Sequence, residues 1–324
     1  MRNDTQSLAI KILSVLGGIL ASLAFCGFLF IAKLFNSGEG LMAFGIIFVA
    51  GAIYTSKKFD KKIIFDTLVV SFFVIGFLLL GLAFAAMDIN ENLICVLFIV
   101  IAFLSIIIAQ NYILSFISTL IISGSILSLI LLNDRYELIH IYIVAFVVII
   151  TYFFLNEAKI IMTNKTLPKL YTPIRIGLTF SFLAGLAFVC KKGLFPLSTQ
   201  YIWLSSIATI SAVIYLLYNL FKVLNINKIQ HQIPIYIFAL FALLPTAFSP
   251  AISGSILLIL LSFYVNYKTG LVLGIVAFIY FIAQYYYDLD FTLLTKSILL
   301  FSSGVLFLAF YLFIHKKLTI NEKI

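Results

Sequence analysis

The sequence carries little charge, and its long apolar segments contain almost none. Only 10% of the 324 residues are Asp, Glu, Lys or Arg, whereas 64% are hydrophobic and the mean hydropathy is +1.20. A soluble domain needs polar side chains on every element, but segments such as Leu138–Leu155 have no polar face. The composition excludes a soluble globular domain and predicts a protein that spans a lipid bilayer.

The residue patterns that carry chemistry are also missing. The sequence contains no Ser-His-Asp arrangement, Gly-rich phosphate loop or GxSxG elbow. His140, His231 and His315 are far apart and lack metal-ligand spacing, so they are read as polar residues near span ends. The three cysteines have no CxxC neighbour and are typical of small packing residues in apolar helices. We therefore expect no enzyme activity, no cofactor and no bound metal.

The apolar runs lack the alternation of polar and apolar residues that a membrane β-barrel needs, so each run is predicted to be a helix. We expect an all-α membrane protein with about twelve spans. The predicted spans are Ile12–Ala32, Leu41–Tyr54, Ile63–Ala86, Leu93–Ala109, Tyr112–Leu132, Leu138–Leu155, Ile176–Cys190, Tyr201–Phe221, Ile235–Phe248, Ala251–Val265, Gly270–Tyr287 and Phe291–Ile314.

Two features of these spans affect the count. The first run, Ile12–Ala32, is longer than the apolar core of a signal peptide and is predicted to remain as a span. Four runs are shorter than the roughly 17 residues usually needed to cross the hydrocarbon core, which leaves open whether they cross fully. These short runs are Leu41–Tyr54, Ile176–Cys190, Ile235–Phe248 and Ala251–Val265.

The basic residues predict that both termini lie in the cytoplasm. On this threading sixteen of the 21 Lys and Arg residues fall on the cytoplasmic side, as the positive-inside rule requires. The longest polar stretch, Asn156–Arg175, becomes a cytoplasmic loop with four of them, including Arg175 itself. The net charge of +9 points to the lipid bilayer and not to a nucleic acid, because these side chains face anionic headgroups.

A short repeat raises the question of internal symmetry in this single membrane domain, residues 1–324. Ile122–Leu127 and Ile252–Leu257 share the sequence Ile-Ser-Gly-Ser-Ile-Leu, five spans apart. One interpretation is a pair of inverted halves, residues 1–132 and 138–267, followed by two C-terminal helices over 270–314. The other is a chance match in a chain rich in Ile, Leu and Ser.

The first candidate site lies at the predicted outer rim. No Asp, Glu, Lys or Arg falls at the middle of a predicted span, and this argues against membrane catalysis and proton-coupled transport. Around the end of the eleventh span, Gln284, Asp288, Asp290 and Lys296 could form an outward-facing polar site for a ligand or partner. The interpretation we favour is structural: an aspartate caps the next helix, and Lys296 extends outward or pairs with an outer carboxylate.

The second candidate site is a proline and small-residue cluster between the ninth and tenth spans. It contains Pro245, Pro250, Ser253, Gly254 and Ser255. One interpretation is a broken helix pair whose exposed backbone binds a substrate, as in transporters. The favoured alternative is a tight turn whose small residues allow close helix packing.

The C-terminal block Gln284–Leu318, with the sequence YYYDLDFTLLTKSILLFSSGVLFLAFYLFIHKKL at its heart, resembles the signature of a bacterial multi-pass membrane family, domain of unknown function 4401. The resemblance extends more weakly over most of the chain, through Tyr171–Gly177. Family members often have an acidic residue before the signature lysine, where this chain has Thr295. The resemblance assigns no activity or catalytic residue. It implies a location in the bacterial inner membrane.

The resemblance also bears on partners and function. Such proteins are often encoded beside another multi-pass protein and a small membrane protein with a GDYxxLxY motif, so a complex with one of these is expected. The leading hypothesis is a non-catalytic subunit or scaffold of an envelope membrane complex. The alternative is a secondary transporter for a neutral or hydrophobic small solute.

Overall fold

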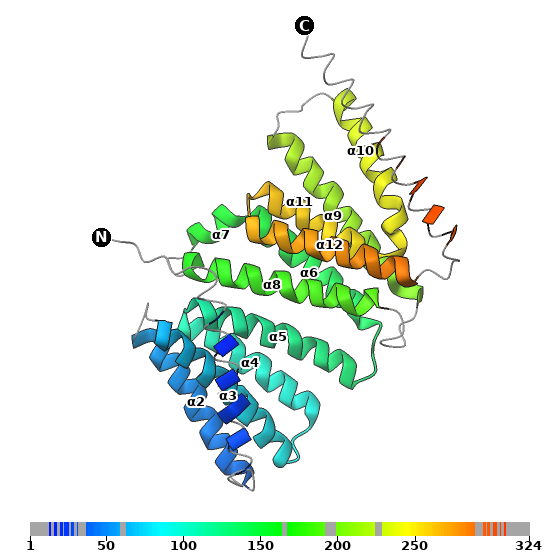
Figure 1. The fold of residues 1–324 in the computed structure, drawn as a ribbon. Coiled ribbons are helices and arrows are strands. Elements are labelled where there is room, and N and C mark those ends of the chain that lie inside the picture. The colour runs from blue at the N-terminus through cyan, green and yellow to red at the C-terminus, as the bar shows by residue number, and fades with distance from the viewer. Residues whose placement is uncertain are drawn as a thin grey trace.

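The structure is a computed structural model, and it is built from helices packed side by side (Figure 1). It describes residues 37–58, 63–163, 167–191, 199–223 and 229–288, together with isolated helical positions between 13 and 31 and between 294 and 308. No strand occurs in these described residues. The all-helical fold predicted from the apolar runs is confirmed for this part of the chain.

The helices follow one another with short connections. Their bounds are α2 Gly38–Lys58, α3 Ile63–Ala86, α4 Glu91–Ala109, α5 Tyr112–Leu132, α6 Leu138–Leu155, α7 Glu157–Thr163, α8 Leu167–Cys190, α9 Ile202–Val223, α10 Ile229–Leu243, α11 Pro250–Tyr264 and α12 Lys268–Asp288, with 3₁₀ turns η2 Thr199–Tyr201 and η3 Leu244–Phe248. Three of them, α3, α5 and α6, have the bounds predicted from the sequence.

Eight of these helices are long and apolar enough to cross a membrane. Two predicted short runs belong to this group, because α2 extends Leu41–Tyr54 at both ends and α8 extends Ile176–Cys190 by nine residues at its start. The other two short runs stay short: α10 and α11 have 15 residues each. The first and last predicted spans, Ile12–Ala32 and Phe291–Ile314, lie mostly outside the described residues.

The helices enclose two main apolar cores. One core lies among α2, α3, α4 and the first part of α5, around Phe73, Phe77 and Leu114. The other runs from the end of α5 through α6, α8, α9, α11 and α12, around Ile143, Phe182 and Leu258. The two cores meet where α5 packs along α8, and α8 in turn lies between α5 and the pair α11 and α12 (Figure 1).

Small residues let the helices approach closely at these contacts. At Gly76 of α3, an added Cβ would lie 2.9 Å from the amide nitrogen of Val49 on α2. At Gly254 of α11, it would lie 2.6 Å from the Leu186 side chain of α8. Close approach through small residues is the usual way in which helices associate in lipid, where the solvent supplies no hydrophobic driving force.

The region around Pro245 and Pro250 is a break between α10 and α11. The chain leaves α10, makes the 3₁₀ turn η3, and re-enters the bundle as α11 at Pro250, where proline suits the first turn of a helix. α10 lies at the edge of the bundle, against α9 and η3, whereas α11 packs among α8, α9 and α12 (Figure 1). The two helices therefore do not form the tight hairpin that the sequence suggested.

Candidate functional site

The small-residue segment Ser253–Gly254–Ser255 is buried and closely packed. Ser253 Oγ lies 2.7 Å from Thr209 Oγ1 on α9, and the Ser255 hydroxyl donates to the carbonyl of Ile252 in its own helix at 2.8 Å. Gly254 faces Leu186 and Phe182 of α8 at contact distance. These contacts match close helix packing and not an exposed backbone.

A row of polar groups continues from this segment along α9. His140 of α6 is fully buried, and its Nδ1 lies 3.0 Å from Ser205 Oγ. The Thr209 hydroxyl donates to the Ser205 carbonyl at 3.0 Å, and the Ser206 hydroxyl donates to the carbonyl of Ala247 in η3 at 2.6 Å. His140 Nε2 is buried with no partner in the described part of the chain. His140 is therefore buried among the helices, near the start of α6 where the sequence placed it, and its position at the membrane interface stays a prediction.

The two copies of Ile-Ser-Gly-Ser-Ile-Leu sit in different surroundings. Gly124 of α5 has nothing within 4 Å of the position of an added Cβ, whereas Gly254 of α11 is packed tightly against α8. Ser123 Oγ lies 2.5 Å from Ser181 Oγ of α8, while Ser253 contacts α9. The division into inverted halves stays a prediction.

Arg175 corrects the prediction that the polar stretch Asn156–Arg175 is a loop, because most of that stretch is helical. The residue is the ninth of α8 and lies inside the helix, not in a loop. It is only 8% exposed, and its Nη1 donates to Glu157 Oε2 of α7 at 3.1 Å. α8 is long and apolar enough to cross a membrane, and a buried arginine in such a helix is costly and marks a candidate functional position.

Aromatic rings surround the Arg175 guanidinium. Its central carbon lies 3.9 Å from the ring centroid of Tyr267, 5.0 Å from that of Tyr171 and 5.7 Å from that of Phe154. The ring faces attract the cation and partly replace water. The cluster contains residues from four elements: the end of α6, the short α7, α8 and the turn before α12.

A length argument could have located Arg175. The apolar run Ile176–Cys190 is 15 residues long, about 22 Å of helix at 1.5 Å per residue, and the hydrocarbon core is about 30 Å thick. A crossing helix had to begin earlier and therefore had to include Arg175. Pro173 obscured this, because a proline inside a helix removes one backbone hydrogen bond and usually indicates a helix boundary or kink.

The predicted outer site is only partly described. The Gln284 side-chain amide donates to Asp288 Oδ1 at 3.1 Å, one turn apart at the end of α12. Asp290 and Lys296 lie outside the described residues. Whether these four side chains form one site, or whether an aspartate caps the following helix, stays a prediction.

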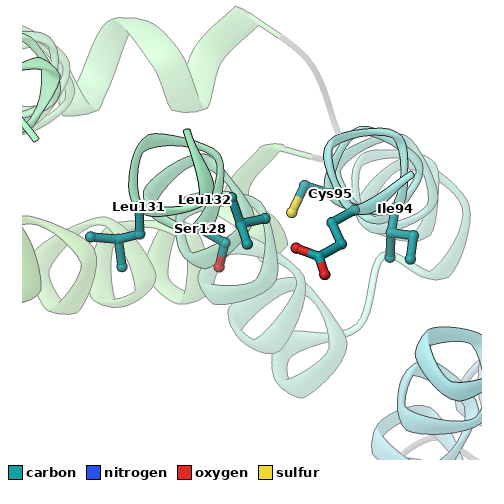
Figure 2. Close-up of a pocket in the computed structure, with 6 residues that line it drawn as sticks. Ile94, Cys95, Ser128, Leu131 and Leu132 are labelled. Atoms are coloured by element: carbon teal, nitrogen blue, oxygen red, sulfur yellow. The ribbon is translucent and has the colours of Figure 1, made fainter. Parts of the chain in front are cut away.

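A shallow groove of about 400 Å³ opens between α4 and α5. In Figure 2, Cys95 of α4 points toward Ser128 and Leu132 of α5 across it. Ile94 and Leu131 also line the groove. Glu91 at the start of α4 also lines the groove. Its walls are mainly apolar, so it suits an acyl chain or a helix side chain better than a polar substrate.

Just beyond this groove the ends of α4 and α5 are joined by an amide pair. The Asn92 side-chain nitrogen donates to Asn133 Oδ1 at 3.1 Å, and the Asn133 nitrogen donates to Asn92 Oδ1 at 2.8 Å. Among the described residues, no group of three His, Cys, Asp or Glu side chains is placed to hold a metal ion.

Comparisons with known proteins place the chain in a family. Residues 7–317 match the family described as Domain of unknown function (DUF4401). Neither the curated proteins nor the solved structures contain a match to the chain. Because the family match covers nearly the whole length, the chain belongs to the family Domain of unknown function (DUF4401).

Proposed function

We propose that this protein is a non-catalytic subunit or scaffold of a membrane complex in the bacterial cell envelope, located in the inner membrane with both termini in the cytoplasm. Its expected partners are a related multi-pass protein or a small membrane protein with a GDYxxLxY motif. In this proposal the chain crosses the membrane twelve times, as the sequence predicts, and the short helices α10 and α11 are two of the twelve spans.

The observation that carries this proposal is the interlocking of α5, α8, α9 and α11. Buried hydroxyl pairs join α5 to α8 through Ser123 and Ser181, and α9 to α11 through Thr209 and Ser253. An added Cβ at Gly177 of α8 would lie 2.7 Å from Thr119 Cβ on α5. Alternating access requires one group of helices to rock against another, and interlocked contacts of this kind favour a rigid body.

Affinity purification in mild detergent tests this proposal. The chain is tagged at its native chromosomal locus and purified through the tag. At least one other integral membrane protein should co-purify with it in a fixed ratio. An unrelated multi-pass protein with the same tag, expressed at the same level, serves as the control. Recovery of the chain alone, as a monomer, would contradict the proposal.

The alternative function, transport of a neutral or hydrophobic small solute, is favoured by the polar row beside the helix break. A buried, unpartnered His140 Nε2 and the hydroxyls of Ser205, Thr209 and Ser253 could bind a solute if the helices around them separated. Transport would require this row to become accessible to water.

A panel of single-cysteine variants tests both the orientation and the alternative. The native cysteines are replaced by alanine, and Arg135→Cys, Thr163→Cys or Ser253→Cys is added. With a membrane-impermeant maleimide on intact cells, we expect labelling of the residue 135 variant at once and of the residue 163 variant only after permeabilisation. The reverse pattern would refute cytoplasmic termini. Labelling at residue 253 would support transport, whereas lack of labelling supports the scaffold.

A further inference from the structure

The guanidinium of Arg175 has an unused hydrogen-bonding edge. Nη1 donates to Glu157, but Nε is buried and has no acceptor in the described part of the chain. A buried N–H of a charged group without a partner is costly, more so than for a neutral group. The edge that carries Nε is therefore available to an oxygen acceptor of a ligand.

The Tyr267 side chain has the same need. It is 9% exposed, its ring lies against the guanidinium, and its Oη is buried without a partner in the described residues. Burial raises the pKa of the Tyr267 phenol, so the group is protonated at neutral pH and can donate. The nearby Ser262 Oγ is also buried and unpartnered, and the Tyr267 amide donates to the Ser262 carbonyl at 2.7 Å.

The surroundings of this cluster are basic. Lys159 follows Glu157 by two positions, Lys169 precedes Arg175 by six, and Lys268 follows Tyr267 directly; all three lysines are exposed. Their field raises the local concentration of anions. Glu157, the ion-pair partner of the buried arginine, has 35% of its side chain exposed.

We propose that Arg175 and Tyr267 form a binding site for a phosphate group. The Nε edge of a guanidinium matches two oxygens of a phosphate, and Glu157 occupies a different nitrogen, so the ion pair and the ligand can coexist. The rings of Phe154 and Tyr171 give the site an apolar wall. A phosphodiester lipid headgroup and free phosphate share this chemistry, and basic sites between helices commonly bind anionic headgroups.

Binding to the purified full-length chain tests the site. Phosphatidylglycerol is titrated in native mass spectrometry, with dioleoylglycerol as the lipid that lacks phosphate. Thermal unfolding is followed in sodium phosphate and in sodium chloride of equal ionic strength. The variants are Arg175→Lys, which keeps the charge but loses the planar fork, and Tyr267→Phe, which removes only the hydroxyl. Arg135→Lys, a conservative change at an exposed arginine, is the matched control.

We expect phosphatidylglycerol, and not dioleoylglycerol, to remain bound, with affinity about tenfold weaker in Tyr267→Phe and at least about tenfold weaker in Arg175→Lys. Arg135→Lys should bind like the wild type. Stabilisation by inorganic phosphate as well would identify a general phosphate site, and stabilisation by the lipid alone a headgroup site. Binding of neither, or equal binding by wild type and Tyr267→Phe, would overturn the proposal. If Arg175→Lys does not fold, Tyr267→Phe decides.

Discussion

Replacing Glu157 by alanine is expected to lower the free energy of unfolding by about 3 kcal/mol. The substitution leaves the Arg175 cation, 8% exposed, without the carboxylate that pairs with it at 3.1 Å. The aromatic rings around the guanidinium compensate only in part, because a cation–π contact contributes about 1–2 kcal/mol. Titration with sodium dodecyl sulfate, followed by circular dichroism, measures the loss.

Companion variants separate the lost ion pair from lost packing. Arg175→Met should cost less than Glu157→Ala, because the remaining carboxylate is 35% exposed and can turn toward water. The double variant Glu157→Ala/Arg175→Met should recover most of the stability, since no buried charge stays uncompensated. Glu137→Ala, at an exposed carboxylate outside the cluster, is the control. The explanation fails if Glu157→Ala is no more damaging than this control.

Replacing Gly76 by alanine is expected to destabilise the protein by about 2 kcal/mol through overpacking of α2 against α3. The new methyl group would lie 2.6 Å from Val49 Cγ2, 2.9 Å from the Val49 amide nitrogen and 3.1 Å from the Gly45 carbonyl oxygen. Two of these are backbone atoms, which cannot rotate away, so the helices must separate. The same detergent titration measures the effect.

Gly51 provides the matched control on the partner helix. An added Cβ there would lie 3.6 Å from the Phe72 ring, an ordinary van der Waals distance. Gly51→Ala should therefore change stability by less than about 0.5 kcal/mol or improve it slightly through helix propensity. Adding Val49→Ala to Gly76→Ala should restore only part of the loss, because the backbone contacts remain. Equal effects of the two glycine substitutions would contradict the overpacking explanation.

The helix ends could be predicted because polar turn residues interrupt the apolar runs. α5 begins after Asn111, whose side chain accepts from the amides of Ile113 and Leu114, and it ends just before Asn133. At the next turn Asp134 has φ of 52°, a left-handed conformation that Asn and Asp adopt more readily than most residues. Hydropathy and turn chemistry agree at these positions, so the predicted and observed bounds coincide.

The candidate sites were less predictable, for two physical reasons. A single cation next to an apolar run is typical of a helix end, and only the required helix length places Arg175 inside α8. Hydroxyl side chains are ambiguous in another way, because serine and threonine in apolar helices can bond to their own backbone. The Ser181 hydroxyl donates to the carbonyl of Gly177 in its own helix and also contacts Ser123 of α5. Only the contact with Ser123 shows which helix packs against α8, and the sequence cannot distinguish the two kinds of contact.

The contact between α5 and α8 also has a consequence for how the chain is made. These two helices are separated by α6 and α7, so α5 emerges from the ribosome well before the helix that covers its hydroxyls. Until α8 inserts, Thr119 and Ser123 must face lipid, where an unsatisfied hydroxyl is costly. Thr119 already donates to the Ser115 carbonyl at 2.8 Å, and Ser123 to that of Leu120 at 3.1 Å. These local bonds lower the cost of exposing the two hydroxyls of α5 to lipid before α8 covers them.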